Sequence, residues 1–318
     1  MTNFQVYRKT LSFSLVMFLV DLLAIVVVLG AATAGFFIGN ASSIEAAIVG
    51  LIIGLIVGII LVSLINIFVT NRIKAAQIAM MTKGVTEGEL PNHTFKEGFN
   101  EIKGRFGRIT AFFFITNAIK SLFRQIGRGI NRVATAVGGD TGNAVSSAID
   151  SAIQTLIGYL CDCCLGWIMF RKEENAFRAG CEGAVIFFKH GKTLIRNIGR
   201  IFGMGFLSFL VIGGAFFGLS FLIFVQFPQM FEYLANELAN GGDMPEFLKD
   251  PKVFMIFVAA ILGIVLWSII HSVLIRPFIL VGVMRNFMAA GQKDMPTESD
   301  FAEMERKYPR FGKLSSKM

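Results

Sequence analysis

Four ionisable side chains stand inside long apolar stretches of the chain: Asp21, Asp150, Asp162 and His271. A charged side chain at the centre of a bilayer costs about 3 kcal/mol or more unless it is paired or hydrated, so such residues often serve function. Carboxylates and an imidazole at membrane depth can bind a cation or hand on a proton. We therefore take these four residues as a candidate substrate or ion pathway.

Two of these residues also have a purely structural interpretation. Asp21 could hydrogen-bond a polar side chain of the next apolar stretch, such as Ser63 or Asn66. His271 lies near the end of the last apolar stretch, where a packed histidine is as reasonable as a proton relay. Both interpretations remain open at the level of sequence.

The composition explains why the surroundings of these residues must be lipid. Hydrophobic residues make up 54% of the chain and charged residues only 16%, with a mean hydropathy of +0.64. Soluble domains carry about 25% charged residues. We predict an all-α, polytopic helical membrane protein with five or six membrane segments and basic amphipathic interfacial helices. Four segments are long enough to span a bilayer: about 11–38, 44–69, 202–225 and 253–275.

A fifth apolar segment, about 144–170, contains Asp150 and Asp162. Basic stretches flank it on both sides, so a single crossing would violate the preference of Lys and Arg for one face. We expect a buried, re-entrant element, unless residues 109–119 or 180–188 supply a partner crossing. The two aspartates are twelve residues apart and would point about 120° apart on a continuous helix, so a shared site requires a broken segment.

The distribution of Lys and Arg predicts the orientation. Residues 70–143 carry eleven of them and residues 171–200 seven, whereas the loop 226–252 carries two against five acids. Both termini should therefore be cytoplasmic in a multi-pass plasma-membrane protein, with 226–252 external. The expected regions are spans one and two (1–70), a basic interfacial region (71–143), the buried segment with an amphipathic helix (144–200), the last two spans (201–285) and a tail (286–318).

A basic stripe recurs every four residues within a predicted helix over about 98–135. It consists of Lys120, Arg124, Arg128 and Arg132. Such a helix typically lies along a membrane surface with its cations on anionic lipid headgroups. A dedicated phosphate site is the alternative, and nucleic acid is not an expected partner.

Gly50, Gly54 and Gly58 are spaced four apart in the second predicted span. Small residues at this spacing let two helices in lipid approach closely. This glycine face could pack inside the bundle or join subunits of a homo-oligomer.

The cysteines Cys161, Cys163, Cys164 and Cys181 lack the second ligand pair that zinc sites usually show. We expect no metal and no cofactor, and we interpret these residues as small packing residues. No phosphate-binding loop, nucleophile elbow or metalloprotease helix occurs, so an enzyme is not expected.

The order of features from about 128 to 300 resembles the C-terminal half of the choline transporter-like family. The matching pieces are Gly142 to Leu160, then Cys161-Asp162-Cys163-Cys164-Leu165-Gly166-Trp167, Asn175-Ala176-Phe177, the span with Gly213-Gly214, and residues 253–287. The acidic segment after that family's last span is replaced by residues 284–290. Gly88-Glu89-Leu90-Pro91 after a pair of spans also resembles small uncharacterised bacterial membrane families.

Two functions follow as expectations. The acids at membrane depth and the family resemblance favour an oligomeric transporter of a small solute, either cationic or proton-coupled. The basic stretches favour a non-transporting membrane scaffold or a protein that binds anionic lipid.

Overall fold

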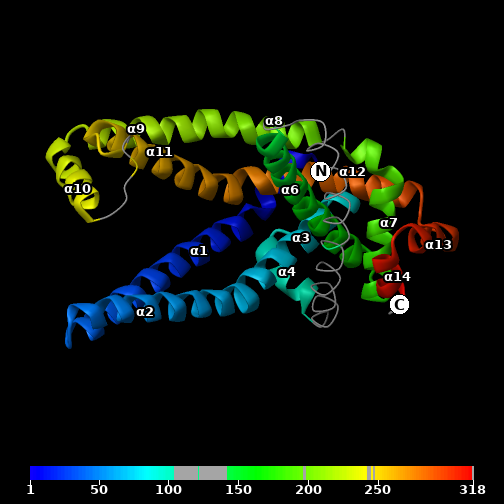
Figure 1. Cartoon of the computed structure of the whole chain (residues 1–318). Helices are drawn as coiled ribbons and strands as arrows, with labels where there is room; N and C mark the ends of the chain where they lie inside the picture. Colours follow the sequence, from blue (N-terminus) through cyan, green and yellow to red (C-terminus); the bar gives the residue numbers. More distant parts are fainter. Residues whose placement is uncertain (104–120, 122–141, 196–197, 242–244, 246–247, 317–318) are drawn as a thin grey trace. The chain divides into compact units, whose positions relative to one another are not determined.

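The computed structural model describes residues 1–103, 121, 142–195, 198–241, 245 and 248–316. Every regular element in these ranges is helical (Figure 1), as expected for an all-α helical membrane protein. The chain forms two compact units, which are treated separately. Unit 1 comprises Met1–Ile198 and Pro277–Met318, and unit 2 comprises Gly199–Arg276.

Unit 1 begins with a long antiparallel hairpin, blue in Figure 1. Helix α1 (Asn3–Asn40) starts with a capping box on Thr2, and α2 (Ile44–Ile65) starts at the N-cap Ser43. The second arm does not stop at Ile65. It continues through a five-residue π-helical turn, η1 (Asn66–Thr70), into α3 (Asn71–Thr86).

Exposure of apolar side chains divides this hairpin into two parts. Large apolar residues are exposed from Leu15 to Ile38 on α1 and from Ile48 to Val69 on the second arm. From Ile73 onward, the second arm is buried by protein. The exposed stretches are about 33–36 Å long at 1.5 Å per residue, close to the roughly 30 Å of a hydrocarbon core. Lipid therefore covers this part of the hairpin.

The remaining helices of unit 1 pack into a helical module around a shared core. Its largest fully buried side chains include Trp167, Tyr159, Phe13 and Phe287. The module consists of the first turns of α1 (Asn3–Ser14), α3, α4 (Thr94–Ile102), α6 (Gly142–Phe170), α7 (Ala176–Ile195), α12 (Arg276–Lys293), α13 (Glu298–Lys307) and α14 (Pro309–Ser315).

Unit 2 is a second hairpin with a short helix between its arms. Phe231 of the short helix packs on Phe254 at the start of the second arm. The first arm consists of α8 (Ile198–Ser208), the π-helical turn η3 (Phe209–Gly213) and α9 (Gly214–Phe224). The short helix is α10 (Pro228–Gly241), and the second arm is α11 (Pro251–Ile270) followed by η5 (His271–Ile275).

Among the described residues, four helices are long and apolar enough to cross a membrane: Asn3–Asn40, Ala46–Thr86, Gly203–Phe224 and Pro251–Lys293. They coincide with the four spans expected from the sequence to within two residues, except that the first begins earlier, at Asn3, and the second and fourth continue beyond the expected ends. The fifth expected segment, 144–170, is not among them. Its apolar part, Gln154–Phe170, is shorter, and α6 is one uninterrupted helix without a break at which a re-entrant chain could reverse.

The two hairpins share one order of elements. The second arm of each passes through a π-helical turn, η1 or η5, into a helix of the module. Each of these helices is followed by a proline, Pro91 or Pro296, and a short helix, α4 or α13. A helix pair with this continuation therefore occurs twice in the chain.

The region expected to be interfacial, 71–143, begins differently in the structure. Its first element, α3, prolongs α2 and is buried by protein along most of its length, from Ile73 to Gly84. Its core positions are small or flexible residues such as Ala75 and Met80, which allow close packing on several sides.

Candidate functional site

A layer of buried polar groups lies where α1 and α3 enter the module. Lys74 Nζ forms an ion pair of 2.6 Å with Asp162 Oδ1 of α6, whose side chain is only 5% exposed. Next to it, Gln77 Nε2 donates to Ser14 Oγ at 2.7 Å and to the Thr10 carbonyl at 3.4 Å. These groups tie α1, α3 and α6 together just beyond the lipid-covered surface.

This pairing gives Asp162 a structural role in the described fold. Its carboxylate is buried among module helices and held by a cation that sequence spacing could not identify. Asp150 lies in the N-terminal half of α6, and its side chain is outside the described side chains. No shared site for the two aspartates is described.

Asp21 and His271 occupy different units. Asp21 is exposed on α1 among exposed leucines and valines, about 9 Å along the helix from the Leu15 end of the lipid-covered surface. The two polar residues suggested as its partners bond within their own helix: Ser63 Oγ donates to the Ile59 carbonyl, and Asn66 Oδ1 accepts from Thr70.

His271 begins η5 in unit 2, half-buried beside the indole of Trp267 at a centroid distance of 5.2 Å. Trp267 Nε1 in turn donates to Ser208 Oγ at 3.2 Å. This small polar group joins α8 to α11 near the end of the hairpin. A pathway through all four residues therefore stays a prediction.

The glycine face of α2 points at α1 of the same chain. A Cβ added to Gly50 would overlap the carbonyl oxygen of Gly35, and one added to Gly54 would overlap that of Ala31. At Gly58 the added atom would lie 2.9 Å from the Cα of Val28. The two backbones are thus in direct contact from Gly50 to Gly58, over about two turns, with no room for side chains between them.

The basic stripe of Lys120, Arg124, Arg128 and Arg132 lies outside the described residues. Its expected contact with lipid headgroups therefore stays a prediction.

The four cysteines are free thiols buried in the module. Burial raises the pKa of Cys181 to about 12, with a further contribution from Glu182, and raises those of Cys163 and Cys164 well above the usual range. Among the described residues, no cluster of three or more His, Cys, Asp or Glu is arranged to hold a metal. Thiols of this kind act as packing groups.

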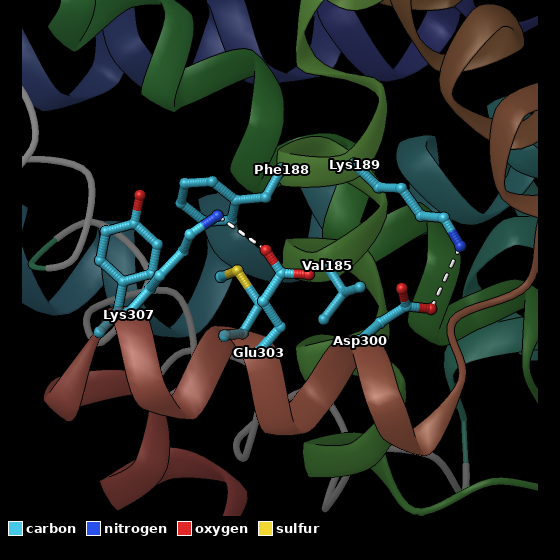
Figure 2. Close-up of a pocket in the computed structure, with 8 residues that line it drawn as sticks. Val185, Phe188, Lys189, Asp300, Glu303 and Lys307 are labelled. Carbon is cyan, nitrogen blue, oxygen red and sulfur yellow. Dashed lines mark hydrogen bonds and ion pairs between the residues drawn. The ribbon is translucent and has the colours of Figure 1, made fainter.

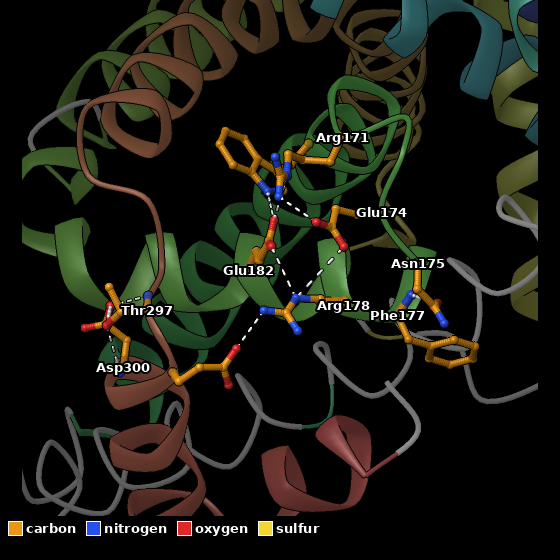
Figure 3. A network of polar contacts seen from close by, with 10 residues as sticks. Arg171, Glu174, Asn175, Phe177, Arg178, Glu182, Thr297 and Asp300 are labelled. Atoms are coloured by element: carbon orange, nitrogen blue, oxygen red, sulfur yellow. Dashed lines mark hydrogen bonds and ion pairs between the residues drawn. The ribbon is translucent and has the colours of Figure 1, made fainter.

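A buried carboxylate organises the junction of α6 and α7 (Figure 3). Glu182 Oε2 accepts from Trp167 Nε1 at 2.9 Å and from Arg171 Nε at 3.3 Å, and Arg178 lies 3.9 Å from its other oxygen. Arg178 also reaches Glu298 of α13 at 2.6 Å. The network links the core tryptophan to the C-terminal helices.

A cavity of about 220 Å³ lies between α7 and the C-terminal helices (Figure 2). On one side, Lys189 Nζ bonds Asp294 at 2.8 Å and Asp300 at 3.2 Å. These bonds raise the pKa of Lys189, and the backbone amide of Thr297 together with Lys189 lowers that of Asp300. The remaining lining residues are Val185, Phe188, Glu303, Met304, Lys307 and Tyr308.

A second cavity, of about 260 Å³, lies between α3, α4 and α6 and is bridged by an ion pair of 2.8 Å between Lys172 and Glu101. In both cavities, lysines and carboxylates neutralise each other.

Sequence reasoning did not identify Glu182 or Asp300, and it assigned Lys189 to a basic stretch for anionic lipid or a cytoplasmic partner rather than to an ion pair with Asp294 and Asp300. Local signals existed: Arg178 and Glu182 stand four apart on a helix, and Thr297 with Asp300 forms a capping box at the start of α13. These signals predict stable helices, but they do not reveal which helices meet.

Comparisons with known proteins leave the chain without an assigned family. It matches no protein-family model, no curated protein and no solved structure. The resemblance to the choline transporter-like family therefore stays a prediction. The long apolar helices indicate an integral, helical membrane protein.

Proposed function

We propose that this integral membrane protein is a non-transporting scaffold whose lipid-covered hairpins hold the helical module at a membrane surface. One observation carries the proposal: α2, η1 and α3 form one continuous helix from Ala46 to Thr86 whose side chains change from lipid-exposed to protein-buried within a single turn after Val69. A continuous helix transmits position and orientation, so the module is fixed to its anchor rather than tethered by a loop.

The charges of the module support the same proposal. Asp162 is paired with Lys74, Glu182 with two arginines, and Lys189 with two carboxylates. The buried members of these pairs, Asp162 and Glu182, are thus held by partly exposed cations, which favours a structural role over capture of a solute. The Gly35–Gly50 backbone contact leaves no passage between α1 and α2.

The positions of the chain ends support the expected orientation. The N-terminal amino group bonds the Gly88 carbonyl at 3.2 Å, and Arg285 bonds the Met1 carbonyl at 2.8 Å. Both regions therefore contact the same module, which supports the proposal that they lie on one side of the membrane. We propose that this side is cytoplasmic because it carries the excess of Lys and Arg. A plasma-membrane location remains part of the proposal.

The test is a flux measurement on the purified full chain in proteoliposomes. A scaffold predicts that proton flux, read with an internal pH dye, and choline or alkali-cation uptake equal those of protein-free vesicles. Flux that rises with protein and falls in Asp162→Asn, with the fold intact, would overturn the proposal.

Transport of a cation or proton by an oligomer is the second candidate, and Asp21 favours it. A carboxyl exposed within an apolar, lipid-covered face costs several kcal/mol unless it is neutralised, which a second copy or a bound cation could achieve. This candidate predicts a flux that disappears in Asp21→Asn and persists in Asp162→Asn. The scaffold proposal predicts no flux in the parent chain or in either variant.

Anionic lipid is the proposed surface ligand of the scaffold. Replacing Lys120, Arg124, Arg128 and Arg132 together by glutamine should reduce enrichment of fluorescent phosphatidylserine around the reconstituted protein, and high salt should reduce it equally in the parent chain. Unchanged enrichment in the fourfold variant would remove anionic lipid as a partner of this stripe.

A further inference from the structure

Helix α10 carries apolar side chains on more of its surface than its protein contacts use. Phe231 and Ala235 are buried against the hairpin, at 3% and 0% exposure. Met230, Tyr233 and Leu234 are exposed, Tyr233 at 66%, and so is Phe227 just before the helix. Gln229, Glu232 and Asn236 form a polar strip on the remaining side. The helix is amphipathic, but only part of its apolar side is covered by protein.

The contacts of the buried part fix the depth at which α10 lies in unit 2. Phe231 packs on Phe224 at the end of α9 and on Phe254 at the start of α11, with ring centroids 4.8 and 6.4 Å apart. The same cluster includes Phe221 and Val258, one turn further into the hairpin. Figure 1 shows α10 beside the ends of α9 and α11. The helix therefore packs against the last turns of the two arms, at the end of the apolar hairpin.

Residues on the lipid-facing surface of the hairpin lie next to the turns of α9 and α11 that contact α10. Leu222 and Ile223 of α9 are 64% and 57% exposed, and Ile256 and Phe257 of α11 are both 44% exposed. The exposed side of α10 continues this surface from Phe227 to Leu234, and the next residue in helical register with Tyr233 is the charged Glu237. Whatever covers the end of the hairpin also covers Met230, Tyr233 and Leu234.

We propose that α10 is an interfacial helix that seats in the headgroup–acyl boundary of the bilayer, with Met230, Tyr233 and Leu234 in lipid and Glu232 in water. Tyrosine suits this depth because its ring is apolar and its hydroxyl reaches water. The polar strip carries an acid and no cation, so the site takes neutral, zwitterionic lipid rather than anionic headgroups. The helix fixes the depth of the unit 2 hairpin from the end opposite η5.

Nitroxide accessibility on the full chain in phosphatidylcholine vesicles tests the proposal. Single cysteines replace Met230, Tyr233 or Glu232 and are spin-labelled, while the native thiols are buried and stay unlabelled. At Met230→Cys and Tyr233→Cys, collision with oxygen should exceed collision with water-soluble nickel chelate several-fold, and at Glu232→Cys the ratio should invert.

Two results would overturn it. Nickel collision at Tyr233→Cys equal to that at Glu232→Cys would place the exposed side of α10 in water. Immobile labels at Met230→Cys and Tyr233→Cys, reached by neither reagent, would show that protein, such as a second copy of the chain, covers this side. Equal secondary structure in all variants, measured by circular dichroism, ensures that each result reports on the folded helix.

Discussion

Removing Lys74 should destabilise the module more than neutralising Asp162 does. In Lys74→Met, the buried Asp162 carboxylate loses its ion pair with the Lys74 ammonium. Breaking a fully buried pair from one side costs about 3–5 kcal/mol. Because the Lys74 side chain is 37% exposed and thus screened by water, we reduce this to about 2 kcal/mol. In Asp162→Asn, the lysine can extend into water, and the expected cost is about 1 kcal/mol.

Thermal unfolding in detergent, followed by tryptophan fluorescence, measures the difference. At about 2–4 °C per kcal/mol for a unit of this size, Lys74→Met should lower the apparent Tm by about 4–8 °C and Asp162→Asn by about half as much. Lys83→Met is the matched control, because Lys83 faces an exposed Glu87 at 3.9 Å and should change the Tm little. The reasoning fails if Asp162→Asn is the more damaging variant, or if Lys74→Met behaves like Lys83→Met.

Three further predictions concern other parts of the structure. Gly50→Leu should separate α1 from α2 and lower the free energy of unfolding by at least about 2 kcal/mol. Gly30→Leu is the control and should be tolerated, because a Cβ added there meets nothing within 4 Å. Equal Tm values for the two variants would refute the backbone contact. The pKa of Asp300 lies below its usual 3.8, and the pKa of Lys189 lies above its usual 10.5. The ion pair should therefore stabilise α13 between pH 3.8 and pH 10.5. This stabilisation should fade as the pH falls through the folded pKa of Asp300 or rises through the folded pKa of Lys189. Protection factors for hydrogen exchange in α13, which correct for the pH dependence of the intrinsic exchange rate, would contradict this assignment if they stayed constant across these limits. The raised pKa of Cys181, about 12, predicts that N-ethylmaleimide at pH 8 alkylates this thiol slowly in the folded chain and quickly after denaturation. Alkylation of the folded chain as fast as that of the denatured chain would instead show an accessible thiolate.

The membrane spans could be predicted from the sequence because each is a long apolar run, and length alone distinguishes it from a core helix. The continuation of α2 into α3 could not be predicted from the sequence. Beyond Val69 the pattern turns amphipathic, and an amphipathic helix looks the same in sequence whether a lipid surface or protein covers its apolar side. Small residues such as Ala75 and Ala76 were the available signal for burial.

The partners of buried charged residues were harder to predict from the sequence than the helices. Asp162 stands in an apolar segment, which suggests a membrane-depth acid, but its partner Lys74 is distant in sequence and comes from another helix. Glu182 lies on a helix that alone would present it to solvent, and only packing of α6 buries it beside Trp167. Charge compensation between elements depends on tertiary contacts, which periodicity within one element does not encode.

The central claim, a lipid-anchored hairpin with its module on one side of the membrane, is tested most directly by labelling single cysteines in sealed, right-side-out vesicles. Asn40→Cys reports the tip of the α1–α2 hairpin, Glu173→Cys the junction of α6 and α7, and Arg306→Cys the C-terminal helices, and all three positions are exposed. We predict that an impermeant maleimide labels Asn40→Cys in intact vesicles and labels the other two only after permeabilisation. Labelling of Glu173→Cys from the same side as Asn40→Cys would contradict the account, because α6 would then lie across the membrane from the tail.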